Sequence, residues 1–139
     1  MIAAVCDSNV YISAIVFGGI PRDVVMLGEQ AQVQLLVSPV LVAEVERVLT
    51  RKFDWEQRRV RRTCRPLWEA ARLVKPVTGV SLCRDPQDNH LLALALDGKA
   101  QYLITGDKDL LVLGAFRDTL IVTPAGFLAG KPWAAHGQE

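Results

Sequence analysis

Two aspartates directly follow short apolar segments of the sequence. Asp7 comes after the run from Ile2 to Cys6, and Asp107 comes one glycine after the run that ends at Thr105. Apolar, β-branched runs bounded by turn residues are typical of strands buried on both faces of a parallel sheet. Open α/β sheets place ligand sites at the carboxyl ends of such strands. The two carboxylates are therefore candidates for one site, with capping of the following helix or turn as the alternative.

Glu44 lies on the inward side of a helical pattern. It stands three residues after Leu41 and four before Val48, on the apolar stripe of a helix expected from Pro39 to Lys52. Lone glutamates are rarely buried without a partner or a metal. The position favours a functional carboxylate, and a solvated place at the edge of the stripe remains the alternative.

Asp88 belongs to the first turn of a helix expected from Pro86 to Gly98, with Asp85 as its N-cap. The helix dipole stabilises a carboxylate there without any further role. Asp88 also precedes Leu91 by three residues, so it leads the inward face and could reach the strand ends. This segment alone supports both interpretations equally.

Four acids thus come from separate segments, each at a strand end or on the inward edge of a helix: Asp7, Glu44, Asp88 and Asp107. Like charges brought together repel unless a cation lies among them. Sites built from oxygen ligands suit Mg²⁺ or Mn²⁺, and the sequence lacks the His and Cys cluster that zinc prefers. Such sites serve metal-assisted hydrolysis of a phosphodiester. Ser8, Asn9 and Thr105 lie beside the acids and could orient water or ligands.

The elements that must position these acids alternate along the chain. Strands are expected at 2–6, 34–37, 100–105 and 119–122, with a weaker candidate from Lys75 to Thr78. Further helices are expected at 10–17, 21–32, 56–74 with a break at Pro66, and briefly from Lys108. This order predicts the α/β class with a parallel sheet.

Length and composition are those of one globular domain, 139 residues long and 50% hydrophobic. We expect a domain at 1–130 and a C-terminal tail at 131–139. The net charge of +1 means that any affinity for nucleic acid depends on local charge placement. We expect a cytoplasmic protein for three reasons. The three cysteines are widely spaced, the sequence has no secretory signal, and no apolar run approaches the roughly 20 residues that span a membrane.

Basic side chains concentrate in the segment from Arg47 to Arg65, which carries eight of them; Trp55 lies within it and Trp68 follows it. This segment could be a rim that binds phosphates, with arginine or tryptophan stacking on bases. It could equally be a solvated helix surface, with Trp68 packed in the core.

Four motifs together resemble the PIN domain, in particular the toxin components of bacterial and archaeal toxin–antitoxin pairs, the virulence-associated protein C-like ribonucleases. They are "CDSNVYISA", the Glu44 of "SPVLVAEVERVL", the Asp88 of "DPQDNHLLALA", and "LITGDKDLL". Each motif is weak alone, but the four occur in the family's order. The resemblance runs from about Ile2 to about Leu128.

The resemblance implies a three-layer α/β/α sandwich with parallel strand order 3-2-1-4-5. It implies Mg²⁺ or Mn²⁺ as cofactor and cleavage of single-stranded RNA that leaves a 5′-phosphate and a 3′-hydroxyl. Asp7, Glu44, Asp88 and Asp107 match the catalytic, metal-binding quartet, Asp109 matches a less regular fifth acid, and Asn9 and Thr105 match polar positions around it. It further implies a homodimer and a small antitoxin partner.

Other α/β enzymes fit the residues less well. A haloacid dehalogenase type phosphatase would need a second aspartate where Asn9 stands. A response-regulator receiver would need a phospho-acceptor aspartate after the third strand and would leave Glu44 and Asp88 unexplained. A non-catalytic PIN fold that binds RNA or protein is the alternative from a different functional class.

Overall fold

Six strands form one sheet in the computed structural model of the chain, which describes residues 1–137. The strand order is β3-β2-β1-β4-β6-β5, and neighbouring strands are parallel except for the antiparallel pair β5 and β6. The predicted α/β class and the parallel order 3-2-1-4-5 are confirmed, with β6 as the fifth parallel strand. The strands are β1 (Ala3–Cys6), β2 (Gln34–Val37), β3 (Arg72–Leu73), β4 (Tyr102–Ile104), β5 (Ala115–Phe116) and β6 (Thr119–Val122).

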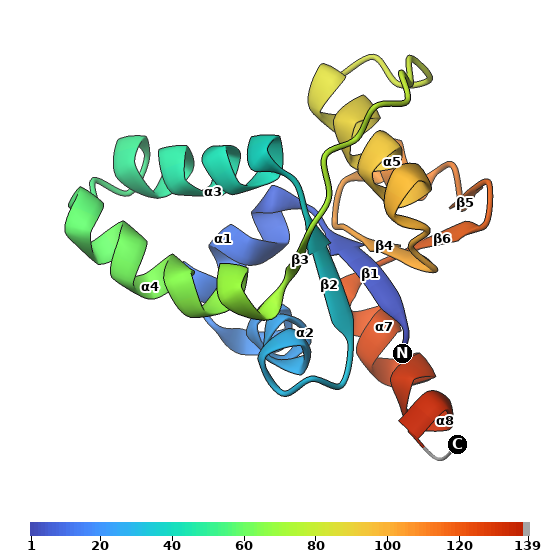
Figure 1. Ribbon diagram of the computed structural model, residues 1–139, viewed down its shortest axis with the longest axis horizontal. Helices are drawn as coiled ribbons and strands as arrows, with labels where there is room; N and C mark the ends of the chain where they lie inside the picture. The colour runs from blue at the N-terminus through green and yellow to red at the C-terminus, as the bar shows by residue number, and fades with distance from the viewer. Residues whose placement is uncertain (138–139) are drawn as a thin grey trace.

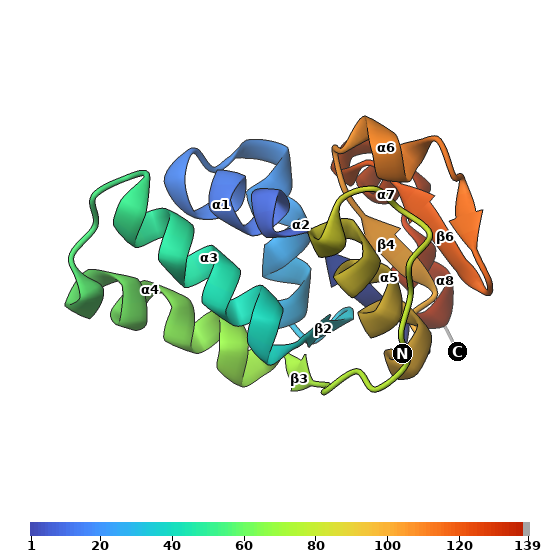
Figure 2. The same ribbon diagram turned by 90° about the horizontal axis from the view of Figure 1, so that it is seen from above.

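Helices cover both faces of the sheet (Figures 1 and 2). A Cβ atom built on Gly28 of α2 would lie 2.7 Å from Leu35 Cδ1, and one built on Gly98 of α5 would lie 2.5 Å from Leu36 Cδ1. Because neighbouring residues of a strand point to opposite faces, α2 and α5 pack closely on opposite sides of β2. The helices are α1 (Ser8–Val16), α2 (Gly19–Glu29), α3 (Pro39–Arg51), α4 (Gln57–Ala70), α5 (Pro86–Gly98), α6 (Lys108–Leu111), α7 (Pro124–Gly130) and α8 (Pro132–Gly137).

The segment between α4 and α5 differs from the prediction. The third strand is Arg72–Leu73, and the predicted strand from Lys75 to Thr78 is wrong. After Leu73 the chain leaves the sheet, and the backbone N–H groups of Val77 and Thr78 donate instead to the Asp97 carboxylate at 2.7 and 2.9 Å. The β-branched residues that suggested a strand belong to an exposed connection, in which Val77 is 92% exposed.

Helix α4 continues through Pro66, where the sequence predicted a break, and ends at Ala70. Pro66 lies on the exposed side of the helix, where water can replace the backbone hydrogen bond that a proline cannot donate. Helices α3 and α4 lie side by side and extend away from the sheet (Figures 1 and 2).

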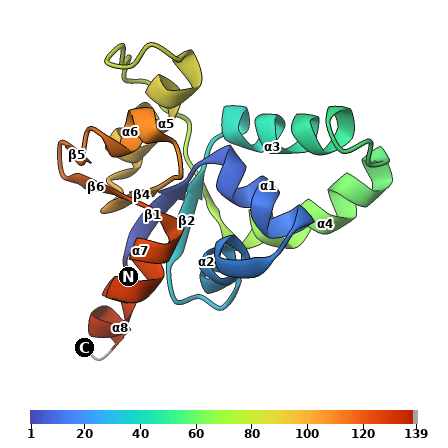
Figure 3. The same cartoon turned by 180° about the vertical axis from the view of Figure 1, so that it is seen from behind.

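Helix α8 follows α7, whereas the sequence predicted no regular element after residue 130. Figure 3 shows α8 continuing below α7. The Trp133 ring packs against Phe127 with 5.3 Å between their centroids, which ties this segment to the core. The last two residues of the predicted tail lie outside the described residues. Within residues 1–137, no single helix is long and apolar enough to cross a membrane.

Candidate metal centre

Asp7 and Asp107 lie at the carboxyl ends of adjacent parallel strands. Cys6 of β1 pairs with Ile104 of β4, and the Asp7 backbone N–H donates to the Ile104 carbonyl at 2.9 Å. Strand β1 has β2 on one side and β4 on the other, so β1 and β4 flank the point where the strand order reverses. Open α/β sheets bind their ligands at this point. The sheet therefore brings the two aspartates to one edge although 100 residues separate them in sequence.

Thr105 links the two strand ends by hydrogen bonds. Its buried hydroxyl donates to Asp7 Oδ2 at 2.8 Å and accepts from the Asp107 backbone N–H at 3.0 Å. The other oxygen of Asp7, Oδ1, accepts from the Asn9 N–H and from the Ser8 hydroxyl, both at 3.3 Å. Asp7 thus caps α1 and still faces the site, so the capping and functional interpretations are compatible. Only 6% of Asp7 is exposed, and these contacts hold its carboxylate in one orientation.

Three carboxylates form a group that could hold a cation. Asp88, Asp107 and Asp109 each offer one oxygen, and these three oxygens lie within 4.8 Å of one another. The Asp107 Oδ1 atom accepts from the Asp109 N–H at 2.8 Å and so caps the short helix α6. Asp88 is buried, whereas Asp109 is exposed, so the group opens to solvent at one side. Carboxylate oxygens are the ligands that Mg²⁺ and Mn²⁺ prefer, and the donor set fits either ion.

The electrostatics of Asp88 reflect this crowding. Burial, followed by the nearby carboxylates of Asp107, Asp85, Asp7 and Asp109, raises the pKa of Asp88 from 3.8 to about 6. Both causes disfavour the charged form, because the carboxylate loses water and meets like charges. A bound cation would reverse this balance by attracting the same carboxylates.

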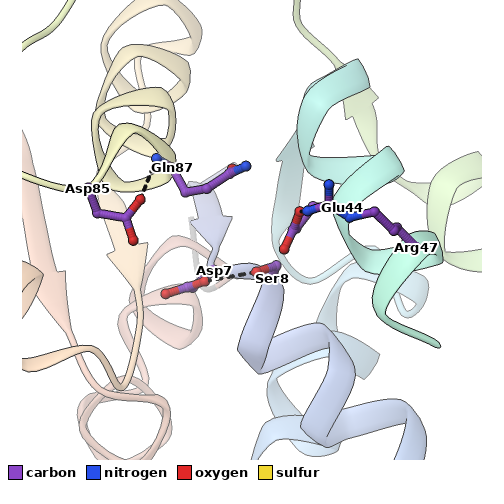
Figure 4. A network of polar contacts seen from close by, with 6 residues as sticks. All are labelled: Asp7, Ser8, Glu44, Arg47, Asp85 and Gln87. Atoms are coloured by element: carbon purple, nitrogen blue, oxygen red, sulfur yellow. Dashed lines mark hydrogen bonds and ion pairs between the residues drawn. The ribbon is translucent and has the colours of Figure 1, made fainter. Parts of the chain in front are cut away.

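Glu44 reaches the site from α3. Its side chain is 18% exposed, pairs with Arg47 one turn further along, and points toward Ser8 and Asp7 (Figure 4). The inward direction inferred from the apolar stripe is therefore the one observed. On the opposite side, Asp85 caps the start of α5 by accepting from the Gln87 N–H at 2.9 Å, and Gln87 extends toward Glu44.

The acids surround one cleft of about 150 Å³. Its lining residues come from the β1 end, α3, the start of α5 and the β4 end: Asp7, Ser8, Asn9, Leu41, Glu44, Asp85, Gln87, Asp88, His90, Leu91 and Asp107. The cleft and the three-carboxylate group share Asp88 and Asp107. Asp7 and Glu44 line the cleft without belonging to the group, and Asp109 belongs to the group without lining the cleft. The structure thus places the four predicted acids around one cavity and the fifth beside it.

Two lining residues, Gln87 and His90, were missed by sequence reasoning, as was the contact of His90 with Ser38. The Ser38 hydroxyl accepts from the Leu41 N–H at 3.1 Å and lies 2.7 Å from His90 Nε2. This bond joins the start of α3 to α5, the helices that carry Glu44 and Asp88. The available signal was the spacing of Gln87, His90 and Leu91, which lie on one side of a helix.

Comparisons with known proteins agree with this architecture. The family model described as "PIN domain" matches residues 3–109, which include every predicted site residue. An uncharacterized protein of Methanocaldococcus jannaschii is 32% identical over 117 residues, covering 81% of this chain and 75% of that protein. The crystal structure of VapBC2 from Rickettsia felis, bound to a DNA fragment from their promoter, has a similar fold, with a TM-score of 0.65 at 9% identity over 88% of this chain and 98% of that one. Because the family model matches well over half of the sequence, the chain belongs to the PIN domain family.

Proposed function

We propose that the chain is an endoribonuclease that depends on Mg²⁺ or Mn²⁺ and hydrolyses phosphodiester bonds of single-stranded RNA, leaving a 5′-phosphate and a 3′-hydroxyl. One observation carries the proposal: carboxylates from four separate segments line a single cleft at the strand ends. Repulsion among them is a cost that a divalent cation would remove. PIN domains are generally nucleases, which agrees with this chemistry.

The residues divide into two groups by position. Asp88, Asp107 and Asp109 would hold a cation, since their oxygens already lie within 4.8 Å of one another. Asp7 and Glu44 form the other wall of the cleft, where their carboxylates can accept a proton from a water molecule or take part in cation binding. A cation held there would lower the pKa of its bound water and would stabilise the negative charge on the phosphoryl oxygens.

Thr105, Ser8 and Asn9 act by orientation. Thr105 fixes Asp7 Oδ2, and Ser8 with the Asn9 N–H fixes Oδ1, so the carboxylate keeps its direction when substrate enters. Asp7 would therefore contribute without the cost of ordering its side chain during the reaction.

We further propose that the chain is the toxin of a toxin–antitoxin pair in the cytoplasm. Its motifs resemble that class, and its fold is similar to that of VapBC2. In this proposal the chain forms a homodimer, and a small antitoxin blocks the acidic cleft. Coexpression with the product of an adjacent small reading frame, followed by copurification, tests the pairing.

The experiment that tests the nuclease is cleavage of a mixed single-stranded RNA by the purified protein with Mn²⁺ or Mg²⁺. Asp7→Asn and Asp107→Asn should each abolish cleavage, as should a chelator. Asp118→Asn, which changes an exposed carboxylate in the β5–β6 turn, is the matched control and should cleave normally. Full activity of both site variants would refute the assignment. RNA binding without cleavage by the unchanged protein would favour the non-catalytic PIN module.

A further inference from the structure

A groove runs between α3 and α4, apart from the acidic cleft. It consists of two adjoining pockets of about 660 and 400 Å³, which share Glu46 and Arg61 as lining residues. The two helices that form its walls project from the sheet side by side (Figure 2). Both pockets are larger than the acidic cleft, so the groove can accept an extended segment of a ligand.

Arginines form a continuous stripe along the groove. Arg58, Arg61, Arg62 and Arg65 recur at spacings of three and four residues, so they share one side of α4 and span about 10 Å along it. Val60 and Cys64 face the core instead. Like charges at these spacings repel one another and destabilise a helix. The stripe therefore lowers the stability of α4 in the free protein, and a bound anionic ligand would relieve this repulsion.

Acidic partners within the chain neutralise little of this charge. Six arginines and two glutamates line the two pockets together, whereas the whole chain has a net charge of +1. Within residues 1–137, Arg58, Arg61 and Arg62 form no ion pair, and Arg65 pairs with Glu69 at 3.5 Å. Glu46 is partly engaged, because it accepts from the Trp68 indole N–H at 3.0 Å. The groove is thus a local cationic surface on a nearly neutral molecule.

The groove also offers apolar surface. Trp68 and Pro66 lie among its lining residues, together with the aliphatic parts of the arginine side chains. Trp68 is held in place on its inner side, where it packs edge-to-face against the buried Tyr11 with 5.2 Å between ring centroids. An ordered aromatic ring beside guanidinium groups suits a ligand that combines flat bases with phosphates.

Arg47 connects the groove to the acidic cleft. It lines the second pocket and forms an ion pair with Glu44, which lines the cleft. A polyanion that enters the cleft is repelled by its carboxylates, so it needs compensating attraction close by. The arginine stripe supplies this attraction along a path that begins at Glu44.

We propose that the groove between α3 and α4 binds the backbone of single-stranded RNA. The bound stretch is the part of the strand that extends out of the acidic cleft, next to the bond that is cleaved there. This inference rests on the proposed nuclease function, because it assigns the groove to the same substrate. A single strand satisfies both features of the groove, since its phosphates meet the arginines and its unpaired bases meet the Trp68 surface.

The test compares two triple variants that lower the net charge equally. One neutralises the stripe with Arg58→Gln, Arg61→Gln and Arg62→Gln. The matched control carries Lys75→Gln, Lys99→Gln and Arg117→Gln, which alter exposed cations outside the groove. Binding of a fluorescent 20-nucleotide mixed-sequence RNA is measured by anisotropy in chelator, without cleavage, at several salt concentrations.

The stripe variant should bind at least tenfold more weakly than the control, and its salt slope should fall by about 0.7 for each phosphate that it no longer neutralises. Thermal denaturation should show that it folds normally, because removing like charges from α4 relieves repulsion. Equal affinity of the two variants would overturn the proposal, as would stripe-dependent binding of polyglutamate with unchanged RNA affinity.

A second assay distinguishes an error in the groove proposal from an error in the nuclease proposal. Hydrolysis of bis(p-nitrophenyl) phosphate with Mn²⁺ requires the acidic cleft but no groove, because the compound is too small to span both. The stripe variant should retain this activity while its cleavage of the 20-nucleotide RNA declines. Loss of both activities to the same extent would contradict a role confined to substrate binding.

Discussion

Replacing Asp88 with asparagine should stabilise the metal-free protein near pH 8. Burial and neighbouring carboxylates raise the pKa of Asp88 from 3.8 to about 6, so its charged form is unfavourable in the folded state. A group with a raised pKa lowers stability as the pH rises through that value. The asparagine side chain has nearly the same shape and removes this charge.

The expected gain follows from the size of the shift. One pKa unit corresponds to about 1.4 kcal/mol, and a shift of about two units sets an upper limit near 3 kcal/mol. Water in the cleft screens part of the repulsion, and loss of the carboxylate from the first turn of α5 removes about 0.5 kcal/mol of dipole stabilisation. We therefore expect a gain of about 1 to 3 kcal/mol, or roughly 3 to 10 °C in melting temperature for a domain of this size.

The assay is thermal denaturation in chelator at pH 8 and pH 5. The gain at pH 5 should be about half of that at pH 8, because at pH 5 most Asp88 of the folded protein is protonated whereas Asp88 of the unfolded chain is still ionised. Adding Mn²⁺ should raise the melting temperature of the unchanged protein and much less that of Asp88→Asn, because ligand binding stabilises only the competent fold. Asp118→Asn is the control for removal of an exposed charge. An equal effect at both pH values, or no gain at pH 8, would refute the crowding of carboxylates around Asp88.

Three further changes test how the site is supported. Ser38→Ala removes both the α3 cap and the bond to His90, so it should cost about 1 to 3 kcal/mol of unfolding free energy in urea titrations, and a negligible cost would contradict that coupling. Gly98→Ala puts a Cβ 2.5 Å from a side-chain carbon of the buried Leu36, and we expect a loss of about 1 to 3 kcal/mol in the same titration. Gly106→Ala, whose Cβ has no neighbour within 4 Å, should be nearly neutral, and equal losses in the two glycine variants would show that packing is not the cause. Hydrogen bonds with Thr78 and with the Val77 N–H lower the pKa of Asp97, so its contribution to folding stability is present above the unfolded pKa and disappears as the pH falls through the lowered value. Asp97→Asn should therefore lose less stability on acidification than the unchanged protein, as measured by urea titrations at several pH values. An unchanged acid dependence would exclude this contribution.

The fold class was predictable because its signals are local. Short β-branched runs, helical stripes and caps such as Asp85 before Pro86 act within a few residues, and the helix at Pro86–Gly98 was predicted with the bounds that the structure has. The segment from Lys75 to Thr78 misled the same reasoning. Its residue types suit a strand, but the Asp97 carboxylate binds its backbone N–H groups outside the sheet.

The candidate site was predictable in its members more than in its arrangement. Strand ends gave Asp7 and Asp107, and the apolar stripe gave the direction of Glu44. For Asp88, local capping explains the residue equally well, and only packing of α5 on the sheet brings its carboxylate close to Asp107 and Asp109. The contact between Ser38 and His90 has no signal in either segment alone.

The sequence by itself determined the alternation of strands and helices and the acids that end them, because periodicity and capping depend on neighbours a few residues apart. Tertiary structure alone decided the raised pKa of Asp88, the cleft that joins four segments, and the arginine groove between α3 and α4. These properties depend on distances between residues far apart in the chain. Such distances are set by how helices pack on the sheet and on each other.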